Sequence, residues 1–476
     1  MRFLKWLPAL LVLTASLAKG QKSPESDVLI ITNVEVVDTR QGLTSPNLTV
    51  VIKQGRIDSI AKHAMIASSH KTQVVNGSGK YLIPGLWDMH AHSAGGPAAP
   101  WDAKIILPLY IANGITGIRD MGGNLQLLKQ RKESIERGEL VGPHMFISGP
   151  FLNGGKPYEY SITANTPQEG RKAVDKLADE HVDFIKVLSE LSRETYFAIA
   201  EESRKQKLTF AGHVPESISA SEASAAGQRS IEHLSGLSIA CSREEGELRK
   251  QRVEAAGRRD NKAYHAAGMR SFDTYDPAKA RALFAELKKN NTWQAPTLSW
   301  WNAQPQLASA SLSDPRLKYV PASVRKSEDW NPDHIRQSTA PDVFADLEKT
   351  VVHYGELTHA LNEAGVPILA GTDSPDPYVV PGFSLHDELA LLVQSGLTPA
   401  QALRTATYNA ALFLGKSESG AAQKGMIADL VLLDANPLVD IHNTRKISAV
   451  ILGGKLFSRK DLDRMLEQVE EEAAKH

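Results

Sequence analysis

Short apolar runs alternate with Ala- and Glu-containing helical stretches through most of the chain, and this alternation already indicates the broad class of fold. Repeated strand–helix units of this kind are typical of a parallel sheet with helices packed outside it. Eight such units close a barrel. The sequence therefore predicts an α/β fold, a (β/α)₈ TIM barrel over residues 83–415, with candidate strands at residues 82–90, 116–120, 144–148, 183–188, 209–213, 230–233, 292–298 and 367–373.

Both ends of the chain have a different pattern, in which short β-rich runs are separated by turn residues. These runs lie at residues 28–32, 48–53, 56–61 and 73–76, and again at 430–434 and 447–452. A chain of 476 residues is long enough for a barrel and a smaller second domain. We therefore expect residues 21–82 and 416–459 to build one small β-sandwich domain together.

Two further segments depart from the barrel pattern. Residues 241–341 interrupt the regular spacing between the sixth and eighth candidate strands and carry the aromatic residues Trp300, Trp301, Tyr319 and Trp330. A segment this long is either a functional cap over the barrel mouth or a plain surface insertion. The charged residues 460–476 predict a helical C-terminal tail that is solvated and has no chemical role.

The first twenty residues are typical of a secretory signal peptide. Arg2 and Lys5 supply the positive start, residues 6–17 form a short apolar run, and residues 18–20 offer a cleavage site. The run is shorter than the roughly 20 residues that span a membrane, and Pro8 interrupts it. We expect an exported protein, periplasmic or secreted, that begins near Gln21 and has no membrane span after the signal at 1–20 is removed.

Composition excludes two other features. The 54 Lys and Arg residues balance 55 Asp and Glu residues, so no basic field exists to bind nucleic acid. The single cysteine, Cys241, excludes a disulfide within the chain, and we expect it to be a small buried residue.

The segment Asp88-Met-His-Ala-His92 follows an apolar run and places His90 and His92 on the same side of a strand. Other candidate strands end on residues of similar chemistry, namely Lys186, His213, His233 and Asp373. Each of these residues alone is more simply explained as a capping or hydrogen-bonding group. In a barrel, however, the carboxyl ends of all strands meet on one face, so the six side chains are expected to converge.

Imidazole and carboxylate groups suit zinc, and an open position on the metal holds a water whose pKa falls to about 7. A lysine in such a cluster is unexpected, because its ammonium group repels cations. If the neutral amine of Lys186 captures carbon dioxide as a carbamate, it becomes an anion with two oxygens that can bridge two metal ions.

The order His-x-His, Lys, His, His, Asp along the barrel strands resembles the amidohydrolase superfamily, in its binuclear subtype with a carboxylated lysine. The resemblance is greatest to imidazolonepropionase-like amidohydrolases and the related Xaa-Pro dipeptidases, and it covers nearly all of the chain that follows the signal. The matching segments are residues 81–92, 182–188, 212–215, 230–234, 370–373, 385–389, 397–403 and 424–430.

The resemblance implies a role for each of these residues. His90 and His92 with Asp373 bind one divalent ion, His213 and His233 bind a second, and carboxylated Lys186 bridges the two; zinc is the expected metal. A metal-bridging hydroxide attacks the substrate carbonyl, and Asp373 is the catalytic residue that carries its proton to the leaving nitrogen. His386, in a matching segment, is more simply a histidine on a helix surface.

The expected reaction is hydrolysis of a C–N bond in a small-molecule amide or peptide, such as a dipeptide or an N-acyl amino acid. Many dipeptidase-like relatives have Gly-Gly-His after the third strand, whereas this chain has Gly-Gly-Lys-Pro-Tyr at 154–158. Lys156 and Tyr158 either meet a substrate carboxylate or are exposed loop residues. A hydrolase of a cyclic amide or lactone, and a catalytically silent binding protein, remain as alternatives. The oligomeric state is open, a homo-oligomer included.

Overall fold

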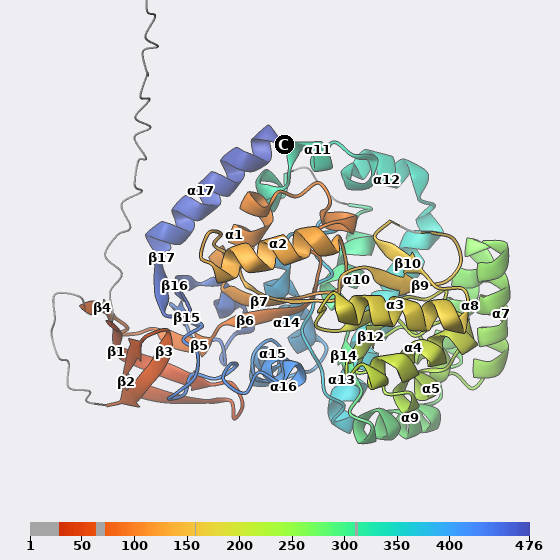
Figure 1. Ribbon diagram of the computed structural model, residues 1–476, viewed down its shortest axis with the longest axis horizontal. Coiled ribbons are helices and arrows are strands. Elements are labelled where there is room, and N and C mark those ends of the chain that lie inside the picture. The colour runs from red at the N-terminus through yellow and green to blue at the C-terminus, as the bar shows by residue number, and fades with distance from the viewer. Residues whose placement is uncertain (1–27, 63–71, 158, 310–312) are drawn as a thin grey trace, which may run out of the picture.

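The computed structural model describes residues 28–62, 72–157, 159–309 and 313–476 (Figure 1). The expected signal peptide lies outside these residues. Strands from both ends of the chain form one eight-stranded sheet, ordered β17-β16-β15-β5-β1-β2-β3, with β4 paired to β1. Its strands are β1 (Val28–Asp38), β2 (Leu43–Lys53), β3 (Arg56–Ala61), β4 (Thr72–Asn76), β5 (Tyr81–Pro84), β15 (Leu430–Leu433), β16 (Ile447–Leu452) and β17 (Lys455–Ser458).

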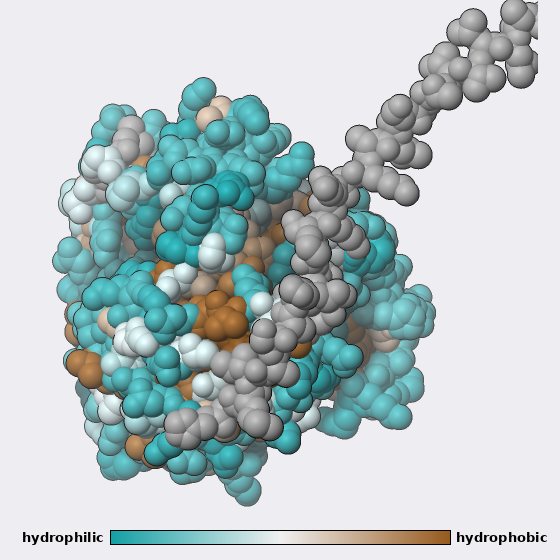
Figure 2. Space-filling model, turned by 90° about the vertical axis from the view of Figure 1, so that its left-hand side faces the viewer, coloured by the Kyte–Doolittle hydropathy of each residue, from teal (hydrophilic) through white to brown (hydrophobic). Residues whose placement is uncertain are grey.

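Apolar side chains from both ends of the chain share the core of this sheet. Ile31 and Val50 from the first strands pack in one cluster with Leu430 and Ile451 from the last ones. A bridge between residues 56 and 427 joins β3 to the segment before β15, so the sheet curls back around its core. The expected β-sandwich built from both termini is confirmed. The face of the molecule on this side is mostly hydrophilic, with a hydrophobic area at its centre (Figure 2).

The barrel strands are parallel and form two sheets, ordered β6-β7-β8 and β10-β9-β11-β12-β13-β14. Every residue of β6 and β7 is buried, as expected for strands covered on both faces. The strands are β6 (Leu86–Ala91), β7 (Ile115–Asp120), β8 (His144–Ile147), β9 (Phe151–Asn153), β10 (Ser161–Thr163), β11 (Ile185–Val187), β12 (Phe210–Gly212), β13 (Ser230–Glu232) and β14 (Trp293–Ala295).

Two of the expected barrel strands differ from the structure. The range 82–90 is divided between β5 in the terminal sheet and β6 in the barrel, and the chain crosses over at Gly85. A side chain there would lie 2.1 Å from the Thr116 hydroxyl, so the crossing requires glycine. The range 367–373 forms isolated bridges rather than a regular strand, with Ile368 beside Gln294 and Ser374 beside Ala91. These bridges still close the barrel between β14 and β6.

Helices between the strands cover the outside of the barrel (Figure 1). Several begin at capping boxes, in which a hydroxyl and a carboxylate or amide satisfy the free N–H groups of the first turn; α3 begins at Thr166 and α15 at Thr398 in this way. The covering helices are α1 (Ala103–Ala112), α2 (Leu125–Glu136), α3 (Pro167–Asp179), α4 (Arg193–Lys205), α5 (Ala220–Ala225), α9 (Pro277–Lys289), α13 (Pro341–Ala364), α14 (Phe383–Gln394), α15 (Pro399–Thr405) and α16 (Tyr408–Leu414).

The segment 241–341 is not a single insertion, because α9 and β14 inside it belong to the barrel. The additional parts are a helical hairpin before α9, at one edge of the molecule, and a group of short helices after β14 (Figure 1). The hairpin follows α6 (Leu237–Ala240) and consists of α7 (Glu245–Arg258) and α8 (Asn261–Asp273). The later group comprises α10 (Leu298–Gln306), η2 (Pro315–Tyr319), α11 (Ala322–Arg325), η3 (Glu328–Trp330) and α12 (Pro332–Ser338).

The expected C-terminal tail is helical, but the prediction that it is solvated was wrong. Helix α17 (Arg459–Lys475) buries Leu462 and Val469 completely and packs against α1. Its charged residues occupy the opposite face. The helix is therefore amphipathic, and its high content of charged residues does not reveal the buried apolar face. Among the described residues, no helix is both long enough and apolar enough to cross a membrane.

Candidate metal centre

The six predicted side chains all line one cavity of about 810 Å³ at the carboxyl ends of the barrel strands. His90 lies in β6 and Lys186 in β11, whereas the other four follow strand ends or lie in the closing segment, namely His92, His213, His233 and Asp373. The prediction that they converge is therefore confirmed as geometry.

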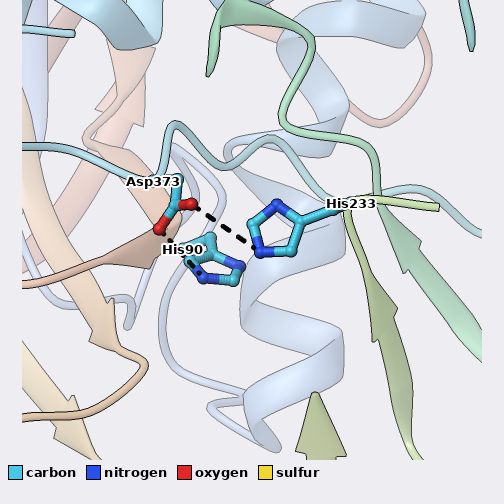
Figure 3. Close-up of side chains that lie close together, drawn as sticks. All are labelled: His90, His233 and Asp373. Carbon is cyan, nitrogen blue, oxygen red and sulfur yellow. Dashed lines mark ion pairs between the residues drawn. The ribbon is translucent and has the colours of Figure 1, made fainter. Parts of the chain in front are cut away.

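Asp373 occupies the centre of this cluster. Its Oδ1 lies 3.3 Å from Nε2 of His90 and 3.1 Å from Nε2 of His92, and its Oδ2 lies 3.7 Å from Nε2 of His233. Figure 3 shows the carboxylate paired with both His90 and His233. Ligand atoms of these three residues lie within 4.8 Å of one another, close enough to share one metal ion. Burial opposes ionisation, but the facing histidines outweigh it and hold the pKa of Asp373 well below its usual range.

The four histidines share an arrangement that suits metal binding. In each one the Nδ1 atom has a hydrogen-bond partner, so the Nε2 atom is left for a ligand in the cavity. The partners are Glu232 Oε2 for His90 (2.7 Å), the Gly122 carbonyl for His92 (2.8 Å), Ser189 Oγ for His213 (2.9 Å) and Thr297 Oγ1 for His233 (2.7 Å). Imidazoles fixed in this way are typical zinc ligands.

Lys186 is 1% exposed, and its Nζ lies 3.5 Å from Nε2 of His90. Burial lowers the pKa of Lys186 to about 8, although Glu232 and Asp373 act in the opposite direction. A side chain this long and this deeply buried is uncommon without a partner. Lys186 therefore lies where metal ions held by these histidines would need an anionic ligand, which a carbamate on its amine would provide.

A buried ion pair beneath the cluster was missed in the sequence. The Arg119 guanidinium on β7 lies 2.9 Å from both carboxylate oxygens of Glu232, and Glu232 in turn holds Nδ1 of His90. Both side chains are fully buried, and breaking such a pair costs about 3–5 kcal/mol. Burial would raise the pKa of Glu232, but Arg119 and His90 hold it well below its usual value. Arg119 and Glu232 are charged residues within expected barrel strands, which indicates buried charge but not which residues pair.

A second buried carboxylate fixes the closing segment. Asp88 accepts a hydrogen bond from the Thr372 hydroxyl at 2.6 Å and one from the Thr372 backbone N–H at 3.0 Å. Burial raises the pKa of Asp88 to about 7. Since Thr372 directly precedes Asp373, this contact positions the central carboxylate even though the segment lacks a regular strand.

A hydrogen bond to helix α14 holds the first turn of helix α10, which lies beside the candidate metal centre. Glu388 of α14 accepts a hydrogen bond from the Ser299 backbone N–H at 2.7 Å, in the first turn of α10. The residue before α10 is Thr297, which has a positive φ of 50° and holds His233. Glu388 therefore positions His233 indirectly, a role that its place in the sequence does not indicate.

Four further residues were singled out in the sequence, and the structure describes three of them, His386, Cys241 and Lys156. His386 is not on a helix surface: it is 2% exposed and bonds Thr444 Oγ1 at 3.0 Å and the Asn113 carbonyl at 3.1 Å. Cys241 is buried, as expected. Lys156 is exposed and lines the cavity, whereas Tyr158 lies outside the described residues.

A model of the family described as "Amidohydrolase family" matches residues 81–457. The chain belongs to the amidohydrolase family. This agrees with the resemblance found in the sequence and identifies the chain as a hydrolase of carbon–nitrogen bonds, in a family that is generally metal-dependent.

The individual proteins similar to this chain share only about a fifth to a quarter of its residues. The chain is 24% identical over 446 residues to an ochratoxinase from Aspergillus niger, covering 79% of this chain and 75% of the relative. A bottromycin amidohydrolase structure superposes with a TM-score of 0.71 at 20% identity, covering 94% of this chain and 91% of the other. A Xaa-Pro dipeptidase with bound methionine gives a TM-score of 0.65 at 19% identity, covering 90% of this chain and 100% of the other. These structural matches support the fold.

Proposed function

We propose that this amidohydrolase cleaves a C–N bond in a small amide or peptide at a centre of two divalent metal ions, with zinc as the metal. The observation that supports the proposal best is the convergence of three imidazole Nε2 atoms on the Asp373 carboxylate. The solved structures named Xaa-Pro dipeptidase and bottromycin amidohydrolase favour a peptide or another amide as the substrate.

In this proposal His90, His92 and Asp373 would hold one ion, His213 and His233 would hold the other, and carboxylated Lys186 would be a ligand shared by both. Asp373 lies within reach of histidines from both groups, which suits a residue that serves the whole centre. Zinc bound there supplies an activated water and polarises the substrate carbonyl.

The protein's own residues carry the proton and hold the geometry. Asp373, ionised in its setting of histidines, accepts a proton from the attacking water and donates it to the leaving nitrogen. The Arg119–Glu232 pair keeps His90 oriented throughout, because both groups are buried and hydrogen-bonded. His90 and Lys186 are each 1% exposed, so bulk water screens their interactions little.

A substrate screen tests the function. Protein loaded with zinc in the presence of bicarbonate is assayed against dipeptides, N-acyl amino acids, cyclic amides and lactones. We expect linear amides to be cleaved, and the activity to disappear when a chelator removes the metal. Cleavage restricted to cyclic amides or lactones would replace the proposed substrate class. A metal-loaded protein that cleaves none of these compounds would favour a binding protein.

We also propose that the protein is exported and loses residues 1–20. The positive start and short apolar run of this segment support the proposal. Amino-terminal sequencing of native protein should give a terminus near Gln21 outside the cytoplasm. Recovery of an intact Met1 terminus from the cytoplasm would contradict export.

A further inference from the structure

Aromatic rings follow one another along one side of the cavity, beginning beside the metal centre. Measured between ring centroids, Trp300 lies 6.0 Å from His233 and 4.8 Å from Trp301. The Tyr354 centroid lies 4.7 Å from that of Trp301 and 6.2 Å from that of Phe272. All four of these rings line the cavity and are only partly buried. We call Trp300, Trp301, Tyr354 and Phe272 the aromatic wall.

The aromatic wall is assembled from three separate helices. Trp300 and Trp301 come from α10, Tyr354 from α13, and Phe272 from α8 of the helical hairpin. The rings therefore do not represent the ordinary buried stripe of one amphipathic helix. Trp300 is held in place because its indole N–H donates a hydrogen bond to Asp376.

The geometry of the aromatic wall suits another ring. The planes of Trp300 and Trp301 meet at 85°, and those of Trp301 and Tyr354 also meet at 85°. A planar group placed in either corner faces one ring and meets the edge of the other, which are the two favoured arrangements of aromatic pairs. A saturated group of similar size gains the apolar contact but not this ring–ring preference.

Two charged residues on the cavity surface, Arg252 and Glu216, are already paired with each other. Arg252 of α7 donates to both carboxylate oxygens of Glu216, at 2.8 and 2.7 Å, and the Tyr264 hydroxyl donates to Glu216 at 2.6 Å. This group is satisfied within the protein and holds the hairpin against the loop that follows His213. Covering the partly exposed rings with an apolar group, by contrast, removes their surface from water and so favours binding of that group.

The size of the cavity also favours a bulky substrate. At about 810 Å³ it lies in the upper part of the roughly 300–1,000 Å³ range of sites that bury drug-sized ligands. A small aliphatic dipeptide would leave the aromatic wall largely in contact with water.

We infer that the substrate carries an aromatic ring next to its scissile amide bond and that the aromatic wall binds this ring. The inference rests on the proposed function for the reaction, but the ring preference itself can be measured by binding alone.

Two pairs of compounds test the inference, one for each side of the amide bond. N-benzoylglycine is compared with N-(cyclohexanecarbonyl)glycine, and N-acetylphenylalanine with N-acetylcyclohexylalanine. In zinc-loaded wild-type protein we expect KM to be about 3- to 10-fold lower for the aromatic member of at least one pair, the size of a ring–ring contribution. Trp301→Leu keeps an apolar side chain but removes the ring, and should bring that ratio close to one.

Trp330→Leu is the matched control, because Trp330 stacks on Tyr378 and does not line the cavity; it should leave the ratio unchanged. If Trp301→Leu fails to fold, Phe272→Leu at the far end of the wall replaces it. Equal KM values within both pairs for the wild type, or a preference that survives loss of the ring, would overturn the inference.

Calorimetric titration with the same pairs separates this inference from the proposed function. An aromatic preference in binding that Trp301→Leu abolishes would uphold the aromatic wall even if no amide is cleaved. Cleavage of amides without any ring preference would uphold the function and overturn the aromatic wall.

Discussion

Asp373→Asn is expected to lower kcat by about 10²- to 10⁴-fold while the protein remains folded and retains much of its metal. An amide cannot accept the proton of the attacking water, so the transfer to the leaving nitrogen is lost. The backbone should tolerate the change, because Asp373 has a positive φ of 62° and asparagine is among the residues that adopt this conformation most readily. Steady-state kinetics and metal analysis of the same preparation measure both effects.

The control for this variant is Asp434→Asn, which makes the same chemical change at a surface residue paired with Lys80. It should leave kcat within about 2-fold of the wild type, as surface changes usually have small effects. An Asp373→Asn enzyme with nearly normal turnover at neutral pH would remove Asp373 from the proton path.

Lys186→Ala is expected to abolish detectable turnover and to weaken metal binding by about 100-fold or more. Loss of a supporting group alone typically costs 10- to 100-fold in metal affinity, and this change removes a proposed bridging ligand. In the proposed centre, the neutral amine of Lys186 attacks carbon dioxide and loses a proton, which yields the carbamate anion. Metal loading of the wild type should therefore improve with added bicarbonate, and a small carboxylate such as acetate should partly restore the variant.

Lys205→Ala provides the control, because Lys205 is an exposed lysine on α4 whose partner is Glu202. It should bind metal and respond to bicarbonate like the wild type. Full metal occupancy in Lys186→Ala, or loading of the wild type that ignores bicarbonate, would show that Lys186 is an ordinary lysine.

The convergence of the six side chains was predictable because it follows from topology. Once short apolar runs are assigned to parallel barrel strands, their carboxyl ends must lie together, whatever the exact strand boundaries. His213 and His233 illustrate this, since β12 and β13 end just before them and both side chains still reach the cavity.

The supporting contacts were not predictable, because they depend on side-chain pairs far apart in the sequence. Arg119 and Glu232 lie in separate strands, and only the closed barrel brings the two charges together. The same holds for Glu388 and Ser299, which meet between two helices. A strand residue that is charged in an otherwise apolar run is a warning of such a pair, but it does not identify the partner.

Two errors had a common physical cause. The tail at 460–476 and His386 were both assigned to the surface from their polarity, yet α17 buries an apolar face and His386 is buried with two hydrogen-bond partners. Polarity indicates exposure only when the surrounding fold offers no partner.

Zinc titration of metal-free protein, in the presence of bicarbonate, tests the central claim most directly. Hydrolysis of the best linear amide from the substrate screen is followed as zinc is added, and bound metal is measured at each step. A two-metal centre predicts that the rate rises from near zero and stops rising at two zinc ions per chain. Full hydrolysis by the metal-free protein, or a rate that does not follow bound zinc, would contradict it.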